Sequence, residues 1–241
     1  MTSKDEQAMR TYWDERARLN AVWYVDTSLS FDAPDLERFF ETGRRVVAEA
    51  LDGSPVQPPG NDLAVEIGAG LGRICRALAE RFDRVVGIDV SSEMLNRARE
   101  LVDEPRITFE VGDGTTLEPL APRSADLILS FTVFQHIPST RVIENYIAEA
   151  GRVLKPGGLF VFQWNNTPGA RRWALRRTLL DLAQRVGVTE RYGRNARAFL
   201  GSRVPLPRIR RALERGGMEL VHTAGLDTLF AWSWAVRRDA P

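Results

Sequence analysis

Cysteine and histidine are scarce in this sequence of 241 residues, and their scarcity limits the chemistry that it can support. Cys75 is the single cysteine, so no disulfide can form within the chain. The two histidines, His136 and His222, are too few to build a zinc site of the Cys/His type. We therefore predict no metal site, with a Mg²⁺ ion held by carboxylates as the open alternative.

Long apolar runs are missing as well. No stretch approaches the roughly 20 apolar residues that span a bilayer, and the first seven residues, MTSKDEQ, are polar, unlike a signal peptide. We expect a cytoplasmic protein without a membrane partner. Hydrophobic residues make up 44% of the chain and charged residues 27%, which is the balance of an ordinary globular protein.

Lysine is nearly absent, because arginine supplies 31 of the 33 basic residues. The net charge is only +1, yet residues 169–215 hold 13 arginines against three acidic residues, a local excess of ten positive charges. One interpretation is a surface that attracts an acidic small-molecule acceptor. The alternatives are a solvated helix face or a contact between subunits, with the protein a monomer or a homodimer.

The spacing of apolar residues predicts an α/β fold. Residues 1–60 are predicted to form a helical cap, with helices over 5–19 and 34–51, the second having one apolar face that packs on a sheet. From residue 62 onward, short apolar runs alternate with helical stretches, as in a parallel sheet. The predicted strands are 63–67, 84–89, 107–111, 125–130 and 158–163, and the helices between them are 74–82, 91–102 and 140–154.

The pattern changes after Trp164. Helices are predicted over 170–186 and 207–216, followed by an antiparallel pair of strands at 218–223 and 228–236. Phe230, Trp232, Trp234 and Val236 alternate along the last strand and should share one buried face. The prediction is a Rossmann-like, doubly wound, seven-stranded sheet, mostly parallel, with an antiparallel C-terminal hairpin. Residues 61–241 form this core, and residues 165–204 form a helical insertion on its substrate side.

A glycine-rich loop follows the first predicted strand, in the stretch Val65-Glu-Ile-Gly-Ala-Gly-Leu-Gly-Arg. Glycine lets a backbone turn tightly and approach a ligand closely. A dinucleotide-binding loop has the spacing Gly-x-Gly-x-x-Gly and receives a pyrophosphate, whereas here the spacing is Gly-x-Gly-x-Gly and Glu66 would repel phosphate. The loop therefore favours a ligand with an amino group, unless Glu66 only caps the next helix.

Two more carboxylates lie at the carboxyl ends of predicted strands. Asp89 ends the second strand, 21 residues after Gly68, where a carboxylate can accept hydrogen bonds from both hydroxyls of a ribose. Asp113 lies at the tip of the third strand and suits an adenine amino group, unless it binds backbone only. Ligands of open α/β sheets bind at the carboxyl ends of the strands. The two carboxylates and the glycine loop should therefore form one site.

Together these features resemble the class I S-adenosylmethionine-dependent methyltransferases, over roughly residues 60–165. The resemblance implies S-adenosylmethionine as the cofactor, S-adenosylhomocysteine as its product, and methyl transfer to an oxygen, nitrogen or carbon atom of a small molecule. The four segments that match in order and spacing are Val65 to Arg73, Gly87-Ile-Asp-Val-Ser, Gly112-Asp-Gly, and Ala125 to Pro138 followed by Leu154-Lys-Pro-Gly-Gly.

The resemblance also assigns contacts with the cofactor. Gly68 and Gly70 would line its methionine part, Asp89 its ribose, and Asp113 with Gly114 its adenine. The N-terminal Tyr-Trp-Asp-Glu-Arg is similar to a helix that covers the cofactor in this family; the alternative is an aromatic helix docked on the core. The predicted cofactor residues are Tyr12, Trp13, Arg16, Glu66, Gly68, Ala69, Gly70, Arg73, Asp89, Val90, Met94, Asp113, Gly114, Phe131 and Gln135.

Methyl transfer from a sulfonium depends on positioning and a dry pocket, and sometimes on a base. His136, in Phe-Gln-His-Ile-Pro after the fourth strand, is the candidate base, because its ordinary pKa lies near 6.5. The alternative is a histidine that shapes the loop or binds backbone. Cys75, in the first crossover helix, is expected in the core. The candidate substrate residues are Tyr24, Trp164, Arg172, Tyr192 and Phe199.

Three other functions compete with this interpretation. An RNA or protein methyltransferase would dock through residues 169–215, but that segment lacks the several aromatic side chains on which nucleic-acid bases stack. A non-catalytic protein that only binds the cofactor is disfavoured because Glu66, Gly68 and Asp89 are all intact. A nicotinamide-dependent oxidoreductase is disfavoured by the glycine spacing and by Glu66.

Overall fold

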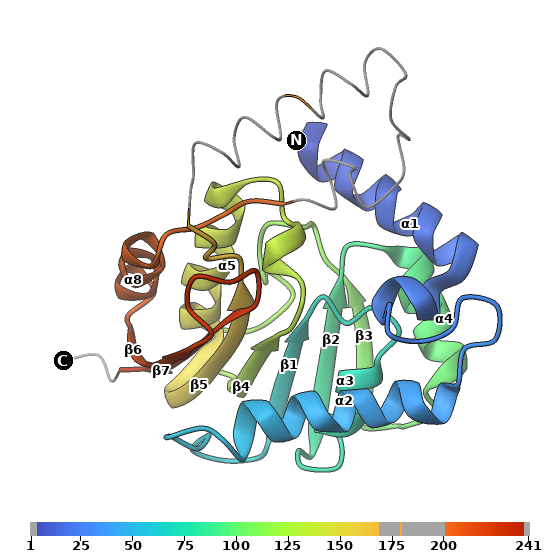
Figure 1. Cartoon of the computed structure of the whole chain (residues 1–241). Coiled ribbons are helices and arrows are strands. Elements are labelled where there is room, and N and C mark those ends of the chain that lie inside the picture. Colours follow the sequence, from blue (N-terminus) through green and yellow to red (C-terminus); the bar gives the residue numbers. More distant parts are fainter. Residues whose placement is uncertain (1–3, 169–178, 180–200, 239–241) are drawn as a thin grey trace.

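The computed structural model describes residues 4–168, 179 and 201–238, and within them a seven-stranded sheet lies between two layers of helices (Figure 1). The strands are β1 (Leu63–Ile67), β2 (Arg84–Asp89), β3 (Ile107–Val111), β4 (Ala125–Ser130), β5 (Leu154–Trp164), β6 (Met218–Ala224) and β7 (Ala231–Arg237). The helices are α1 (Lys4–Val25), α2 (Leu36–Leu51), α3 (Arg73–Leu78), α4 (Ser92–Leu101), the 3₁₀ turn η1 (Phe134–His136), α5 (Thr140–Val153) and α8 (Leu206–Arg215).

The strand order confirms the predicted sheet. It runs β3-β2-β1-β4-β5-β7-β6, and β1 pairs in parallel with both β2 and β4. Strand order therefore reverses at β1, which places the loop after β1 at the switch point where open α/β sheets bind ligands. β7 is antiparallel to both of its neighbours, so the C-terminal hairpin is also as predicted.

Alternating side chains on the central strands fill two separate cores. Leu159 and Val161 of β5 point into the core shared with α2, α3 and α4, whereas Phe160, Phe162 and Trp164 point into the core shared with α5 and α8. This alternation is the period of two that an extended chain imposes. Both faces of the sheet are therefore covered by helices. A ligand can reach the sheet at the carboxyl ends of its strands.

Side-chain caps fix where the helices begin. The carboxylate of Asp35 accepts the N–H of Arg38 at 3.0 Å and starts α2. The hydroxyl of Ser91 accepts the N–H of Met94 at 3.1 Å and starts α4 directly after β2. Such caps satisfy backbone donors that the first helical turn leaves unpaired. The chain therefore turns from strand to helix within a few residues, right beside Asp89.

Several element boundaries differ from the prediction. α1 continues to Val25 across a kink at Asn20, whose side-chain amide donates to the carbonyl of Phe31. α3 stops at Leu78, four residues before the predicted end. β5 already begins at Leu154, because Leu154 pairs with Ala125 before Pro156 and the glycines that follow it. Pro156 therefore lies within β5, after the end of α5.

The last strand is also shorter than predicted, because β7 begins at Ala231. Trp232 and Trp234 are buried as expected, but Phe230 lies before the strand and is 53% exposed. Leu229 is likewise exposed on the same hairpin. The alternation rule failed for Phe230 because it holds only inside the strand. None of the helices that the structure describes combines the length and apolar composition of a membrane span.

Candidate functional site

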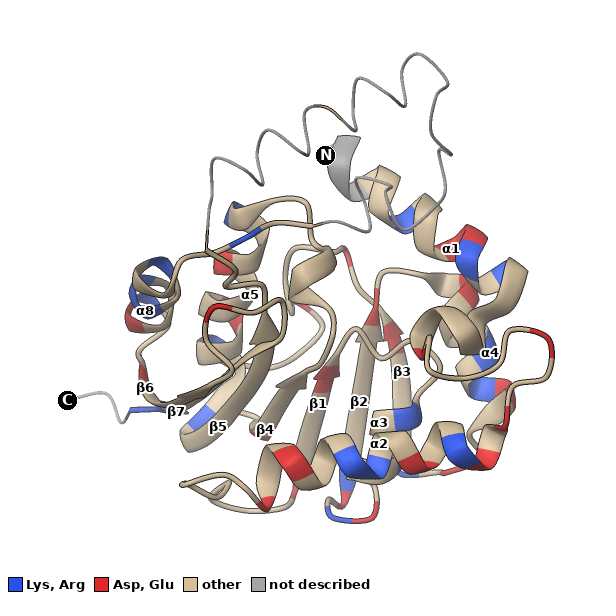
Figure 2. Ribbon diagram, viewed as in Figure 1, with Lys and Arg blue, Asp and Glu red and all other residues tan. Residues whose placement is uncertain are grey.

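A cavity opens at the carboxyl ends of β1 and β2, below α1. It holds about 910 Å³ of free space including its open mouth, and the glycine loop after β1 forms its floor. Figure 2 shows acidic residues at the carboxyl ends of β1, β2 and β3. The predicted residues that line the cavity are Trp13, Tyr24, Glu66, Gly68, Ala69, Gly70, Arg73, Asp89, Val90, Met94, Phe131 and His136. We call it the first cavity.

Gly68 shows why the loop needs glycine. Its φ is +79°, a backbone conformation that favours glycine, and a Cβ there would collide with the side chain of Val133. The loop after β1 is therefore pressed against the loop after β4. The N–H groups of Gly68 and Ala69 both donate to the carbonyl of Ile88, at 2.7 and 3.0 Å, which ties the loop to β2.

Glu66 is a buried carboxyl group on the cavity wall. Its side chain is 2% exposed, and the thiol of Cys75 donates a hydrogen bond to its Oε2 at 2.9 Å. Burial raises the pKa of Glu66 to about 8, although the hydrogen bond from Cys75 and the charge of Arg73 act in the opposite direction. A cationic group in the cavity would favour the ionised form. Cys75 itself is in the core, as predicted.

Asp89 connects the glycine loop to the start of α4. Its Oδ2 accepts the N–H of Gly70 at 2.9 Å and its Oδ1 accepts the N–H of Ser91, also at 2.9 Å. Burial raises the pKa of Asp89, against the lowering effect of these donors. The carboxylate is therefore held in one orientation at the cavity wall, where its remaining lone pairs can accept hydrogen bonds from hydroxyl groups.

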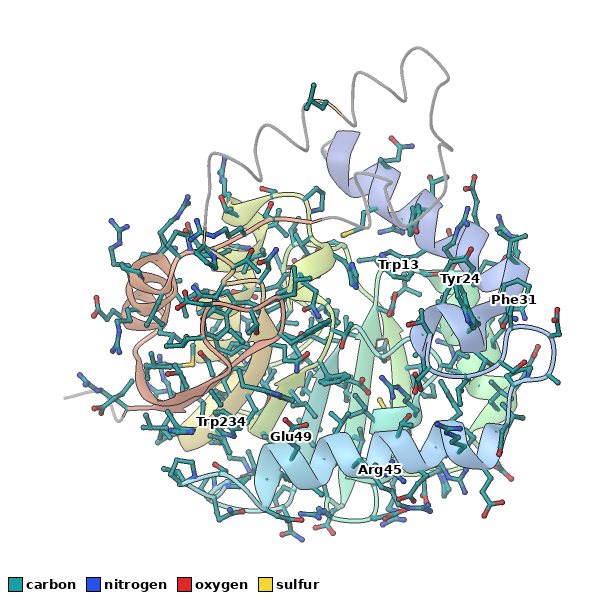
Figure 3. All side chains as sticks on the ribbon, viewed as in Figure 1. Trp13, Tyr24, Phe31, Arg45, Glu49 and Trp234 are labelled. Atoms are coloured by element: carbon teal, nitrogen blue, oxygen red, sulfur yellow. The ribbon has the colours of Figure 1, made fainter. Side chains whose placement is uncertain are left out.

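α1 covers the cavity with one side of its helix. Trp13 and Tyr24 line the cavity, and Figure 3 shows both on the side of α1 that faces the strands. Met9 also lines it, one turn before Trp13. The spacing of four between Met9 and Trp13 was the signal in the sequence that could have identified Met9. Arg16 is 5% exposed and donates to the hydroxyl of Tyr24 at 2.9 Å, so it acts on the cavity wall through Tyr24.

Arg73 lines the first cavity and also a second, adjoining cavity. Its guanidinium donates to Thr42 Oγ1 at 2.6 Å and forms an ion pair with Asp26 at 3.4 Å. It also lies over the ring of Phe131, 5.6 Å from the ring centre. Burial lowers the pKa of Arg73, opposed by Asp26 and Glu66. Thr42 and Asp26 were not predicted, because they come from α2 and from the loop after α1, far from Arg73 in sequence.

The second cavity adjoins the first and opens toward the β6–β7 hairpin. It holds about 1120 Å³ including its open mouth. Gln135, which was predicted to bind the cofactor, lines this cavity and is not among the residues that line the first. Leu229 and Phe230 form part of its rim. The residues common to both cavities are Tyr24, Val25, Arg73, Phe131, Thr132 and His136.

Other predicted residues lie away from both cavities. The carboxylate of Asp113 accepts hydrogen bonds from the backbone and side chains of Thr115 and Thr116, so it orders its own turn. Gly114 is buried beside Val90. Tyr12 is 5% exposed and has its ring 5.4 Å from that of Trp13. None of these three is part of either cavity wall within the described residues.

The prediction that Trp164 contacts the substrate is wrong. Its side chain is fully buried beside Phe162, and its indole N–H donates to the carbonyl of Val204 at 3.0 Å. Trp164 lies on the same face of β5 as Phe160 and Phe162, which is the face that packs in the core, so it lines neither cavity. The other three predicted substrate residues, Arg172, Tyr192 and Phe199, lie outside the described residues, as does the predicted helix 170–186 apart from residue 179. No group of three metal-binding side chains occurs in the described part of the chain.

Comparison with known proteins shows which family this chain belongs to. Residues 65–162 match the family model of the methyltransferase domain. An uncharacterized methyltransferase of Geobacillus sp. (strain WCH70) is 30% identical over 152 residues, which cover 62% of this chain and 68% of that protein. The chain belongs to the class I S-adenosylmethionine-dependent methyltransferases. The matched segment of this methyltransferase runs from β1 to β5 and includes the glycine loop, Asp89 and η1.

Two further relatives show how far the likeness extends. The trans-aconitate 2-methyltransferase of Methylobacterium radiotolerans is 33% identical over 52% of this chain and 46% of its own length. The structure of magnesium protoporphyrin IX methyltransferase from Synechocystis PCC 6803 with bound SAH has a TM-score of 0.61 and 17% identity, and covers 97% of this chain and 100% of that one. That likeness shows the fold. The chain spans less than half the length of several curated relatives that it matches, between 39% and 46%.

Proposed function

We propose that this methyltransferase binds S-adenosylmethionine in the first cavity and transfers its methyl group to an oxygen, nitrogen or carbon atom of a small molecule in the second cavity. The observation that carries the proposal is a pair of carboxyl groups on the wall of the first cavity, the buried Glu66 and the partly buried Asp89, on either side of a glycine loop. The names of two relatives, which refer to trans-aconitate and to magnesium protoporphyrin IX, support a small-molecule acceptor.

The residues of the first cavity fit this cofactor in charge and shape. Glu66 has no basic partner within hydrogen-bond distance among the described residues, so an ammonium group would satisfy it. Asp89 is held by two N–H donors with lone pairs left for ribose hydroxyls. Met94 and Val90 supply an apolar wall suited to an adenine ring. A Cβ on Gly68 would collide with Val133 and force apart the two loops that line the cavity.

The chain's own residues would act by holding and shielding the reactants. S-adenosylmethionine supplies an electrophilic methyl group when bound. Trp13 and Tyr24 of α1 close the first cavity on one side and exclude water. Phe131 and His136 line both cavities, so an acceptor atom approaches the cofactor between them. His136 would then accept a proton from the acceptor. The centre of the Trp13 ring lies 5.5 Å from the centre of the His136 ring.

The first test is cofactor binding by calorimetry. We expect S-adenosylmethionine to bind with micromolar affinity and NADH not to bind, because the loop lacks the Gly-x-Gly-x-x-Gly spacing of a pyrophosphate site and Glu66 offers a pyrophosphate no positive charge. Asp89→Ala should lower the affinity by about tenfold or more, through loss of hydrogen bonds to a charged acceptor. Asp89→Asn keeps one acceptor oxygen and separates the loss of charge from any disturbance of the loop.

The matched control is Asp52→Asn, an exposed aspartate paired with Arg81 at the end of α2, which should leave binding unchanged. Binding of NADH in place of S-adenosylmethionine would overturn the proposal. Binding of the cofactor without formation of S-adenosylhomocysteine across a broad panel of small acceptors, RNA and peptides would favour a non-catalytic binding protein. Product formed with RNA or peptides alone would assign the other acceptor class.

A further inference from the structure

Gln135 carries a buried amide group that lacks a partner. The residue is 5% exposed, and within the described part of the chain neither its Nε2 nor its Oε1 has a hydrogen-bond partner. An unpaired buried polar group destabilises the folded state, because the hydrogen bonds that it made with water are not replaced. Native proteins therefore pair almost all such groups, and an exception calls for a functional reason.

The backbone of Gln135 is fixed from two sides. On one side Phe134 is fully buried and stacks on Tyr146 of α5. On the other side Gly201 packs against the carbonyl of Gln135, with a φ of +50° and no space for a Cβ. The 3₁₀ turn η1 is therefore clamped between α5 and the segment before α8. Gln135 therefore lines the second cavity from a rigid position, and both of its amide atoms are buried there.

The charges around the second cavity are already balanced. Arg73 is paired with Asp26 at 3.4 Å and with the Thr42 hydroxyl at 2.6 Å. The carboxylate of Asp26 also accepts hydrogen bonds from Ser28, and its pKa is lowered: burial raises it, but the bonds from Ser28 and Thr42 and the charge of Arg73 outweigh that effect. Val46, Leu229 and Phe230 add apolar surface. Among the described residues that line this cavity, Gln135 is the one whose buried side-chain atoms have no hydrogen-bond partner.

We propose that Gln135 is the specificity residue for the acceptor and binds an uncharged group that both donates and accepts a hydrogen bond. The acceptor is a mainly apolar molecule with a hydroxyl or carboxamide group at the inner end of the second cavity. This inference rests on the proposed function, since it takes the second cavity as the acceptor site. It replaces the role in cofactor binding that the sequence suggested for Gln135.

An uncharged group fits the amide better than an ionised one does. A hydroxyl can accept from Nε2 and donate to Oε1, which satisfies both atoms. A carboxylate only accepts, so it would leave Oε1 facing a negative oxygen. It would also lose its hydration, and the arginine among the described residues that line this cavity is already paired with Asp26, so the loss would be costly. The second cavity should therefore prefer a hydroxyl compound to the matching carboxylate.

Four naphthalene derivatives of similar shape test this preference: 2-naphthol, 2-methoxynaphthalene, 2-methylnaphthalene and 2-naphthoate. Each is titrated by ligand-observed NMR into the protein, with and without S-adenosylhomocysteine. We expect 2-naphthol to bind at least about tenfold more tightly than 2-methylnaphthalene and 2-naphthoate, as two hydrogen bonds allow. The compound with a methoxy group, which only accepts, should fall between them.

Gln135→Met should remove the preference while S-adenosylhomocysteine binds unchanged. Its melting temperature should stay equal or rise, because an apolar side chain replaces an unpaired amide. The matched control is Gln163→Met, a glutamine that is 4% exposed and lines neither cavity, and it should keep the preference for 2-naphthol.

Equal binding of 2-naphthol and 2-methylnaphthalene, or no binding of either, would overturn the inference, as would a preference that persists in Gln135→Met. A fall of several degrees in the melting temperature of Gln135→Met would show that the amide has a partner within the protein and would also overturn it. Failure of S-adenosylhomocysteine to bind the wild-type protein would instead contradict the proposed function. The titrations without this nucleotide then still measure the preference.

Discussion

Gly68 determines how closely the loop after β1 approaches the loop after β4. We predict that Gly68→Ala lowers cofactor affinity by about tenfold or more and reduces the melting temperature, because alanine is strained at a φ of +79° and its Cβ collides with Val133. Calorimetry and thermal unfolding measure the two effects.

A second substitution separates the two causes. Val133→Ala removes the γ carbons that the new Cβ would meet, so the double variant should recover part of the loss and leave the part due to backbone strain. Coupling of this kind is expected between residues in contact. Unchanged binding in Gly68→Ala alone would contradict the close approach of the two loops.

The sequence identified individual residues well where a motif fixed their place along one strand. Glu66 near the end of β1, Asp89 at the end of β2 and the glycines of the loop after β1 line the cavity at the switch point, while their contacts with the cofactor stay predictions. Trp164 was wrongly predicted to contact the substrate. Phe160, Phe162 and Trp164 are two residues apart along β5, so all three point to the same buried face of the sheet. Thr42 could not be found at all, since its contact with Arg73 depends on how α2 packs on α3.

At the scale of elements, one aspartate ties α1 to the rest of the site. Asp14 Oδ1 accepts the hydroxyl of Ser91 at 2.6 Å and the N–H of Glu93 at 3.4 Å, at the start of α4. Arg10 adds a bond from its guanidinium to the carbonyl of Gly112 at 3.1 Å. These bonds hold α1 above the ends of β2 and β3, as Figure 1 shows.

We therefore predict that Asp14→Ala raises amide hydrogen exchange in α1 and weakens S-adenosylmethionine binding by roughly fivefold to tenfold, the cost of losing one or two hydrogen bonds. Exchange elsewhere in the sheet should not change. Asp14→Asn keeps the Oδ1 acceptor and is expected to behave nearly as the wild type does. If α1 exchanged equally in all three proteins, Asp14 would not be its tether.

The order of helices and strands was largely predictable, whereas their ends and their mutual packing were not. N-cap residues such as Asp35 and Ser91 indicate where a helix begins, because their side chains bind backbone N–H groups only a few residues further along the chain. The kink of α1 at Asn20 and the exposure of Phe230 depend on contacts made after folding. The second cavity joins α2, η1 and the β6–β7 hairpin, three segments far apart in sequence, so no local pattern could reveal it.

For the whole molecule, the buried carboxyl group of Glu66 makes stability depend on pH. Its pKa is about 8 in the folded protein against an ordinary value of 4.5. Between these values the folded state keeps a proton that the unfolded state has released, so the free energy of unfolding falls as pH rises, by up to about 1.4 kcal/mol per pH unit. Asp89 shifts in the same direction. Above pH 8 the fall should level off.

We predict that the melting temperature drops between pH 6 and pH 8, by roughly 2–4 °C for each kcal/mol, and that Glu66→Gln flattens this slope. Saturating S-adenosylmethionine should flatten it as well, because its ammonium group favours the ionised carboxylate, and the stabilisation by the cofactor should therefore grow as pH rises. Thermal unfolding of both proteins at several pH values, with and without cofactor, measures these effects. An equal slope in the wild type and in Glu66→Gln would mean that Glu66 is already ionised in the free protein, and the cavity would then need another explanation for its affinity toward a cation.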